Sequence, residues 1–290
     1  KVELIYRKSN TMKKAIFSTE ISLLRSTMQR LLRRSAHTNI TKILRKTHQA
    51  DVALIMRSLN QYEQNTVFSL CPTALHKARL LEELDESLIE KILQDENSKT
   101  ISKIFRYLDT NDQATIIGML SQDKQNEILK IIEDDDKEEV EEIMSYPDDS
   151  AGSIMTKETF TLNQSSSVKD SIKKLQSFPE NDKIFYLYVL DNKEKLVGVV
   201  SLRTLVTSKN SKKLKDIMIK DIQAATTDTD QEEVAKKVAQ YNYLALPVVN
   251  RQNRFLGIVT IDDVVDIIRE EASEDFLQMA GVGKDREILL

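Results

Sequence analysis

Two patterns of apolar and polar positions divide this chain. Between residues 50 and 145 the apolar positions recur at helical spacing, and Leu59, Leu84, Leu108 and Ile132 stand 25, 24 and 24 residues apart. A polar pair or trio follows each of these four residues, where a helix N-cap belongs. This period predicts short helices joined by tight turns and stacked as a small α-solenoid.

From residue 150 to 272 the pattern changes to a mixed α/β one that occurs twice. Amphipathic helices are predicted over 168–176 and 231–241, and β-branched strands over 185–190, 196–201, 246–249 and 255–260. Landmarks repeat at matched distances, since Met155 precedes Met218 by 63 residues and Gly198 precedes Gly257 by 59. The chain therefore contains two copies of one α/β unit.

The segment after the last predicted strand is strongly acidic. Asp263, Asp266, Glu270 and Glu274 are spaced 3, 4 and 4 residues apart, so a helix places them on one stripe. Like charges at this spacing repel each other, and a bound cation or a basic partner relieves the repulsion. A solvated helix face is the alternative interpretation, and binding of a divalent metal is the first functional hypothesis.

Composition restricts the remaining function classes. The chain has 290 residues, 40% of them hydrophobic, and contains 1 cysteine and 3 histidines. No nucleophile–base set and no phosphate-binding loop is evident, so we expect no enzyme and no catalytic residues. No apolar stretch of about 18 residues is present, so no segment is predicted to span a membrane.

The charge of the chain is unevenly distributed. Residues 1–46 contain 12 Lys and Arg against two acids, whereas the whole chain has a net charge of −4. Because only Tyr6 and Phe17 could stack on bases there, we expect no nucleic-acid partner. Contact of residues 1–46 with anionic lipid and contact with the acidic remainder of the chain both stay open. Two amphipathic helices are expected in this segment, with the apolar residues Leu23, Leu24, Leu31 and Leu32.

Several motifs carry a family resemblance. LPVV at 246–249 and GIVTIDD at 257–263 resemble the CBS domain. YPDDSAGSIMT at 146–156, TDTDQEEVA at 227–235 and EEASED at 270–275 resemble the cytosolic portion of MgtE-type magnesium transporters and channels. The order of the segments also matches this family, and the resemblance covers roughly residues 50–283.

The resemblance implies an α+β multidomain fold, in which an all-α superhelical solenoid precedes a tandem CBS (β-α-β-β-α) pair and an acidic connecting helix. In the family a transmembrane pore domain follows, so we expect a soluble fragment that belongs at the cytoplasmic face of the cell membrane. The expected domains are a basic helical segment at 1–49, the solenoid N domain at 50–148, CBS domains at 149–212 and 213–266, and a connecting (plug) helix at 267–290.

The resemblance further implies that intracellular Mg²⁺ bridges the solenoid, the CBS pair and the plug helix and thereby closes the pore. Mg²⁺ keeps several waters and usually takes only one or two carboxylates directly, which suits a bridge between acidic surfaces. The positions that match the family's metal ligands are Asp230, Glu232, Asp263, Asp266, Glu271, Glu274 and Asp275, together with Asp112 in the solenoid.

Three positions depart from the family pattern. Asn111, Thr115 and Asn242 stand where the family often has an acid, although Asp109 offers a substitute near the first two. An amide oxygen brings no charge to a metal site. We therefore expect fewer or weaker magnesium sites at the solenoid–CBS interface.

CBS pairs often bind adenine nucleotides, and the resemblance implies ATP as a second ligand. The matching positions are Tyr186 for stacking and Ser201 and Arg203 near the ribose or phosphates. The family's ribose-binding Asp falls at Thr204, which weakens this expectation because a ribose diol prefers a carboxylate acceptor.

A second class of function stays open. A soluble adenylate-sensing CBS module could dock a protein partner through its helical solenoid. In either class CBS pairs usually associate through their helices, so we expect a two-fold homodimer. The reading frame beyond Leu290 distinguishes the two classes, because only a transporter continues into apolar spans.

Overall fold

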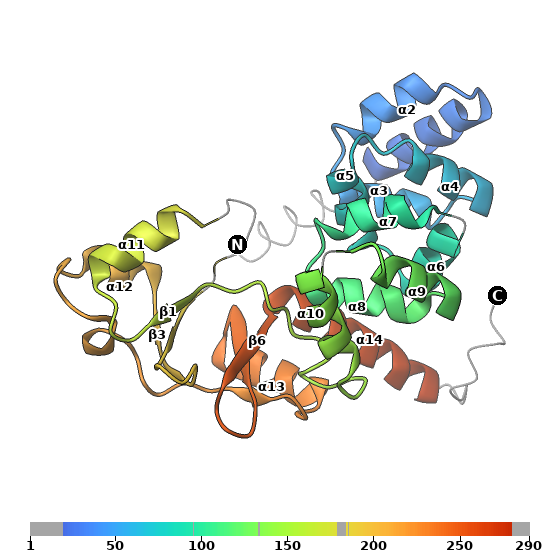
Figure 1. The fold of residues 1–290 in the computed structure, drawn as a ribbon. Coiled ribbons are helices and arrows are strands. Elements are labelled where there is room, and N and C mark those ends of the chain that lie inside the picture. Colours follow the sequence, from blue (N-terminus) through green and yellow to red (C-terminus); the bar gives the residue numbers. More distant parts are fainter. Residues whose placement is uncertain (1–19, 95, 133, 179–183, 185, 280–290) are drawn as a thin grey trace, which may run out of the picture. The chain divides into compact units, whose positions relative to one another are not determined.

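The chain folds into two compact units, seen in a computed structural model that describes residues 20–94, 96–132, 134–178, 184 and 186–279 (Figure 1). The helical unit comprises Lys1–Leu108 and Thr115–Glu133. The mixed unit comprises Asp109–Ala114 and the chain from Asp134 onward.

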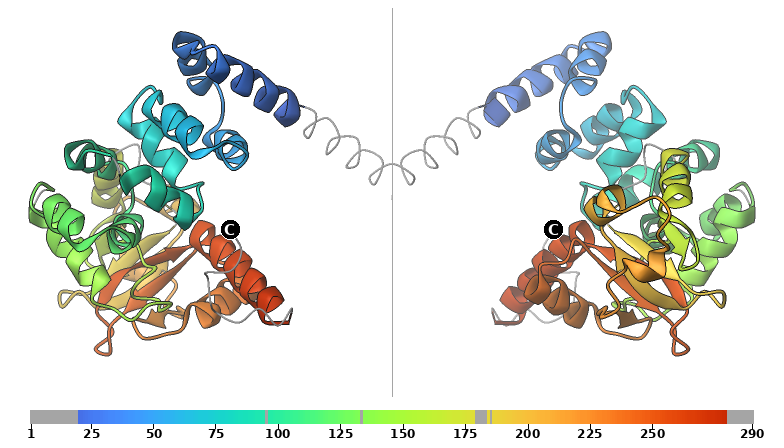
Figure 2. Two further views of the ribbon diagram at one scale, coloured as in Figure 1. Left: turned by 90° about the vertical axis from the view of Figure 1, so that its right-hand side faces the viewer. Right: turned by 90° about the vertical axis from the view of Figure 1, so that its left-hand side faces the viewer.

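The helical unit is a succession of short helices, one after another along the chain (Figure 2). Its first described element is a helix over residues 20–33. The helix α8 begins in the mixed unit and continues in the helical unit. The bounds are α2 (His37–Leu44), α3 (Gln49–Met56), α4 (Gln61–Ser69), α5 (Ala74–Leu81), α6 (Glu86–Gln94), α7 (Ser98–Phe105), α8 (Thr110–Met119) and α9 (Gln122–Leu129).

The period predicted from the sequence corresponds to helix ends. Leu59, Leu84 and Leu108 follow the ends of α3, α5 and α7 and are all buried. Asn60 then caps α4, since Glu63 N donates to Asn60 Oδ1 at 3.0 Å and Asn60 N donates to Glu63 Oε2 at 3.2 Å. This reciprocal capping box satisfies two donors that a helix start leaves without partners. The predicted α-solenoid is therefore confirmed.

The most buried residue of the helix over residues 20–33 is Met28 rather than one of its leucines. Met28 is 1% exposed, while Leu23 is 67% exposed. Five residues separate them, which turns Leu23 about 140° away from Met28 around the helix. Leu23 therefore faces solvent, whereas Leu24, Leu31 and Leu32 are half-buried.

The mixed unit contains two small sheets of the same design. In each sheet the first two strands are parallel and the last two antiparallel, in the orders β1-β2-β3 and β4-β5-β6. The strands are β1 (Thr161–Asn163), β2 (Leu187–Leu190), β3 (Leu196–Val200), β4 (Ala225–Thr226), β5 (Ala245–Val249) and β6 (Phe255–Thr260). The helices are α10 (Asp134–Met144), α11 (Val168–Gln176), α12 (Leu202–Thr207), the 3-10 helix η1 (Leu214–Asp216), α13 (Gln231–Tyr241) and α14 (Ile261–Met279).

The segment that precedes each copy pairs with the last strand of the other copy. Thr156 N donates to Ile258 O at 2.8 Å, and Ile258 N donates back to Thr156 O at 3.0 Å. Val199 and Ile219 exchange the equivalent two bonds, each at 2.9 Å. A Cβ at Gly257 would lie 2.5 Å from the Thr156 carbonyl oxygen, so this close approach requires glycine. The two copies are therefore interlocked by backbone hydrogen bonds.

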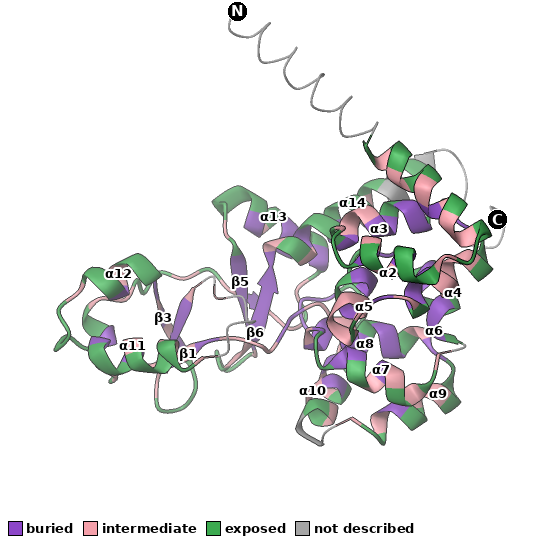
Figure 3. Cartoon of the chain, turned by 90° about the horizontal axis from the view of Figure 1, so that it is seen from above, coloured by how far each residue is buried: buried purple, intermediate pink, exposed green. Residues whose placement is uncertain are grey.

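The two sheets share an apolar core. Tyr188 of β2 and Ile258 of β6 lie in one buried cluster with Leu196 and Ala245. The Tyr188 ring packs against Phe255 with 5.2 Å between ring centroids. The strands β5 and β6 are accordingly buried almost throughout (Figure 3). The mixed unit thus has a core built from both copies.

Candidate functional site

Three of the predicted magnesium ligands lie together where α13 begins beside α14. Asp230 is the N-cap of α13, with Glu232 N donating to Asp230 Oδ1 at 2.8 Å. Glu232 pairs with Lys236 at 2.6 Å. Glu271 of α14 accepts a hydrogen bond from Gln231 Nε2 at 2.9 Å. We call Asp230, Glu232 and Glu271 the α13–α14 acidic cluster.

Lys236 is the counter-ion of this cluster. The hydrogen bond to Glu232 and the charge of Glu232 raise the pKa of Lys236, and the charges of Asp230 and Glu271 raise it further. The three acids therefore lie within electrostatic range of one ammonium. The Lys236 side chain is 72% exposed, and exposed ion pairs of this kind stabilise a fold only weakly. A cation from solvent can therefore replace Lys236 beside these acids with little loss of folding free energy.

Asp263 lies at the start of α14, where it takes part in the helix cap. Thr260 N and Thr260 Oγ1 donate to Asp263 Oδ2 at 3.0 and 2.6 Å. Asn111, in the first turn of α8, donates from Nδ2 to the other carboxylate oxygen at 3.2 Å. An amide donor thus contacts Asp263 at the position where the family resemblance implies a second acid.

Asn111 also presents an oxygen without a hydrogen-bond partner. The residue is 7% exposed, and its Oδ1 is buried with no partner among the described residues. A carbonyl oxygen is a hard, uncharged donor that suits Mg²⁺ or a water molecule. The neighbouring Thr110 donates from N and Oγ1 to Glu158 at 3.3 and 2.5 Å. The first turn of α8 is therefore bonded to acids of the mixed unit on two sides.

The other predicted ligands are Asp266, Asp112, Glu274 and Asp275. Asp266 pairs with Arg269 on the exposed side of α14 at 3.0 Å. Asp112 is half-buried and follows Asn111 in α8, and Thr115 is exposed in the helical unit. The side chains of Glu274 and Asp275 lie outside the part of the chain that is described.

Asn242 has a backbone role that sequence reasoning missed. It ends α13 in the left-handed region, with φ 53° and ψ 43°. The next amide, Tyr243 N, donates to Val238 O at 3.1 Å and closes the last turn. Asparagine is one of the few non-glycine residues that adopt this conformation readily.

Within the described ranges, no three His, Cys, Asp or Glu side chains form a group that could enclose a metal ion. A hydrated Mg²⁺ does not need such a cage, because it keeps several waters and takes one or two carboxylates. Asp230 and Glu232, both exposed, and the half-buried Glu271 fit this mode of binding.

The predicted nucleotide positions are partly occupied by contacts within the chain. Tyr186 Oη accepts from Leu244 N at 3.3 Å. Ser201 Oγ caps α12 by accepting from Thr204 N at 3.0 Å, and the two hydroxyls lie 2.8 Å apart. Arg203 is exposed. The arrangement offers no carboxylate at Thr204 for a ribose.

Tyr188 was not singled out from the sequence. It is 2% exposed, burial raises its pKa, and its hydroxyl has no hydrogen-bond partner among the described residues. Tyr186 lies edge-on to it, with 6.3 Å between the ring centroids. Its place in a strand of apolar residues gave no signal of this unpartnered hydroxyl.

A charged contact at α10 was also not predicted. Lys157 donates to Glu142, which accepts a second hydrogen bond from Tyr146 Oη at 2.9 Å. Burial alone would raise the pKa of Glu142, but these hydrogen bonds and the Lys157 charge lower it below its usual value. Burial raises the pKa of Glu139, and the charge of Glu158 adds to the effect. One lysine therefore neutralises a group of acids here.

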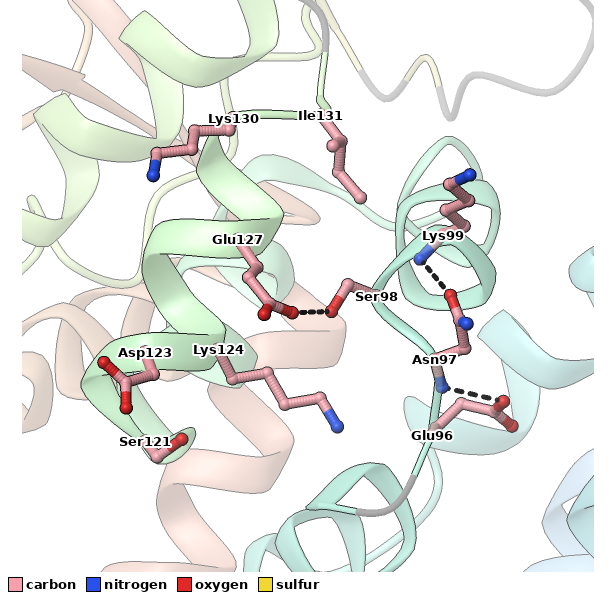
Figure 4. A pocket seen from close by; sticks show the side chains of 10 residues that line it. All are labelled: Glu96, Asn97, Ser98, Lys99, Ser121, Asp123, Lys124, Glu127, Lys130 and Ile131. Carbon is pink, nitrogen blue, oxygen red and sulfur yellow. Dashed lines mark hydrogen bonds between the residues drawn. The ribbon is translucent and has the colours of Figure 1, made fainter.

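The helical unit has an open pocket of about 580 Å³ between α7 and α9 (Figure 4). Ser98 Oγ donates to Glu127 at 2.7 Å across it. Lys124 Nζ donates to Leu93 O and Gln94 O, each at 2.6 Å. These bonds satisfy the last carbonyls of α6, which a helix end leaves without partners. The polar groups of this pocket thus connect successive helices.

The fold and the arrangement of acids define a helical domain followed by a pair of CBS domains. Residues 47–149 match the family model of the MgtE intracellular N domain, and residues 151–210 and 214–270 match that of the CBS domain. No helix within the described residues is long and apolar enough to cross a membrane.

Curated relatives give the particular family. Over 144 residues, 49% of this chain, the sequence is 43% identical to the magnesium transporter MgtE of Bacillus subtilis. Over 143 residues it is 38% identical to the magnesium transporter MgtE of Thermus thermophilus. Each match covers 49% of this chain and 32% of the relative, so the aligned part spans about a third of these proteins.

Two solved structures match most of the chain. The cytosolic domain of the Mg²⁺ channel MgtE in complex with ATP superposes with a TM-score of 0.78 at 28% identity, covering 84% of this chain and 99% of that one. The soluble part of a magnesium transporter has the same fold, with a TM-score of 0.73 at 23% identity over 87% of this chain and 99% of that one. The chain thus comprises an MgtE N domain followed by tandem CBS domains, and it is homologous to the magnesium transporter MgtE.

Proposed function

We propose that this chain is the Mg²⁺-sensing regulatory region of a magnesium transporter. In this proposal it lies at the cytoplasmic face of a cell membrane and controls its own transmembrane pore domain. Homology to MgtE supports the class of protein. The observation that supports Mg²⁺ as the ligand is the α13–α14 acidic cluster, in which three acids share one exposed lysine.

The proposed mechanism is electrostatic. Without a bound cation, acids that face each other repel, by roughly 4 kcal/mol for two unit charges 4 Å apart at an effective dielectric of about 20. Bound Mg²⁺ removes this repulsion and favours an arrangement in which the helical domain, the CBS pair and α14 close together. The cation shifts the equilibrium only by its difference in affinity for the two states.

The support for Mg²⁺ binding differs among the predicted ligands. Asp230, Glu232 and Glu271 are the primary residues. Asp263 and Asn111 offer a second, weaker place, because an amide replaces one charge there. Asp112, Asp266, Glu274 and Asp275 remain proposed ligands on the strength of the family resemblance.

Thermal melts with Mg²⁺, Ca²⁺ and ATP test the proposal. At free Mg²⁺ about ten times its Kd, linkage stabilises the folded protein by about 1.4 kcal/mol, which raises Tm by about 3–5 °C. The double variant Glu232→Gln with Glu271→Gln is expected to lose most of this shift.

The matched control is Glu233→Gln with Glu141→Gln. Each of these acids pairs with a lysine one turn away, as Glu232 does. The control also removes two negative charges, so its change in net charge equals that of the test variant. The control is expected to keep the full Mg²⁺ shift. A wild-type protein whose Tm and protease sensitivity ignore Mg²⁺ but respond to ATP would instead be an adenylate-sensing module.

ATP is the second candidate ligand, and the structure that matches with a TM-score of 0.78 contains it. Tyr186, Ser201 and Arg203 are the positions proposed to contact it. Because the Thr204 hydroxyl bonds to Ser201 and brings no charge, we propose that ATP binds more weakly than it would beside a carboxylate. An Arg203→Ala variant that keeps its full ATP response in the melt would contradict this placement.

The proposed partner of the CBS pair is a second copy of this chain. Val206 of α12 and Val265 of α14 occupy matching positions of the two copies and are 69% and 40% exposed. Ile268 and Phe276 extend the apolar surface along α14, at 47% and 71% exposed. Exposed apolar side chains gathered on these helices support the proposal that they form an interface.

A further inference from the structure

The first two described helices of the helical unit present a group of basic side chains to solvent. They lie on the helix over residues 20–33, on α2 and in the turns that follow each helix. Every one of them is exposed. We call this group the basic surface: Arg25, Arg30, Arg33, Arg34, Lys42, Arg45 and Lys46.

The apolar faces of the same helices are already used for packing. Met28 is 1% exposed, and Ile40 and Leu44 of α2 are both fully buried. A helix that buries its apolar stripe turns the opposite side to solvent. Arg30, Arg33 and Lys42 accordingly lie on the sides of their helices that face away from these buried residues.

The basic surface forms no ion pair with an acid among the described residues. Glu20 is the single acid between residues 20 and 46. The match to the MgtE N domain begins at residue 47, so the family model does not include this surface.

We propose that the basic surface binds the anionic headgroups of lipids at a membrane surface. The choice of a membrane rests on the proposed function, which puts the chain beside one. Basic residues near an anionic leaflet each contribute to binding, and the contributions add. Leu23, 67% exposed on the same helix, adds the apolar contact that interfacial helices use.

Nucleic acid fits the basic surface less well. Between residues 20 and 46 the sequence contains no Phe, Tyr or Trp. Proteins that bind single strands stack bases on such side chains, and basic residues alone give no platform for them.

Sedimentation with lipid vesicles tests the proposal on the whole chain. We expect the protein to bind vesicles of phosphatidylcholine mixed equally with phosphatidylglycerol, and not vesicles of phosphatidylcholine alone. Added salt weakens the binding because it screens exposed charges. The triple variant Arg25→Gln, Arg30→Gln and Arg33→Gln should bind about a hundredfold more weakly, since each lost contact reduces affinity about fivefold. Glutamine keeps the helix propensity of arginine.

The control variant neutralises three exposed lysines of the mixed unit, Lys169, Lys173 and Lys209. It changes the net charge equally and is expected to bind like the wild type. Inorganic phosphate at matched ionic strength should not displace the vesicles, which separates a lipid surface from free phosphate.

Three results would overturn the proposal. One is a wild-type protein that ignores the anionic vesicles, as expected if the basic surface lies on the chain's own acids. Another is equal loss of binding in the control, and the third is unchanged binding of the triple variant. The Mg²⁺ shift in Tm is measured on the same samples. If that shift persists without vesicle binding, only the lipid inference fails and the proposed function stands.

Discussion

Asn111 determines how the first turn of α8 is bonded within the mixed unit. Its amide donates to Asp263 without any cation, and its oxygen has no hydrogen-bond partner among the described residues. A carboxylate at the same position would face Asp263 with a like charge. The identity of this one side chain therefore sets how strongly the contact depends on Mg²⁺.

We predict that Asn111→Asp lowers Tm in the absence of divalent cations and that Mg²⁺ restores it. Two facing carboxylates repel by at most about 4 kcal/mol, and Mg²⁺ relieves this repulsion. Asn111→Ala loses the hydrogen bond, worth about 1 kcal/mol, and gains no response to Mg²⁺. Melts of the two variants with and without Mg²⁺ measure the difference. Equal responses of the two variants would contradict this account.

Cys71 gives a second prediction at the scale of one residue. Burial raises the pKa of its thiol to about 12, although the Lys77 charge lowers it somewhat. Because the thiolate is the reactive form, native Cys71 should react with a thiol reagent at pH 8 about a thousandfold more slowly than in urea. As the single cysteine of the chain, it reports opening of the helical unit alone. Reaction of the native protein at the rate of a free thiol would refute the prediction.

At the scale of one element, α10 carries two carboxyl groups with opposite pH behaviour. Glu142 has a lowered pKa, so its contribution to stability is present above its unfolded-state pKa and is lost as pH falls through the folded value. Glu139 has a raised pKa, so its contribution is complete below the unfolded-state pKa and is lost as pH rises through the folded value.

We therefore predict opposite effects of two neighbouring substitutions. Glu142→Gln should reduce the free energy of unfolding by about 1 kcal/mol at neutral pH, because Lys157 loses its closest partner. This difference should shrink at pH 3, because the contribution of Glu142 is lost as pH falls below its unfolded-state pKa toward the lowered folded value. Glu139→Gln should raise stability slightly at neutral pH. Urea unfolding at the two pH values measures both effects. If both substitutions changed the free energy of unfolding in the same direction, the opposite pKa shifts of Glu139 and Glu142 would be contradicted.

Elements that are long and amphipathic could be predicted from the sequence. The helices at 168–176 and 231–241 and the strand at 255–260 have the predicted bounds. The strands β1 and β4, of 3 and 2 residues, are too short for an alternating pattern. The predicted limit between the second CBS domain and the plug helix falls inside α14, where no break in the helical pattern marks it.

The candidate site could be predicted only in part. The acids at Asp230, Glu232 and Glu271 were identified by motif, and the structure groups them. Their counter-ion Lys236 and the amide of Asn111 could not be identified in the same way, because partners depend on contacts between distant segments. Asn242 was interpreted only as a departure from an acid of the family pattern, whereas it forms the left-handed end of α13.

At the scale of the whole molecule, the proposed dimer gives a further prediction. Val206→Glu with Val265→Glu should convert a dimer into a monomer, because each charge would be buried in an apolar interface without a partner. Leu23→Glu, at an exposed apolar site of the helical unit, should leave the mass unchanged. Light scattering after gel filtration measures the mass. A dimer that survives the double substitution would exclude this surface as the interface.

The exchange of edge partners between the two copies also constrains the order in which the chain can fold during synthesis. The first sheet has all three of its strands once residue 200 has left the ribosome, yet its outer edge stays open until Ile219 emerges. Thr156 is synthesised early, but the strand residue that pairs with its backbone, Ile258, follows about a hundred residues later. A ribosome stalled between these points would carry a half that is complete in sequence and incomplete in structure.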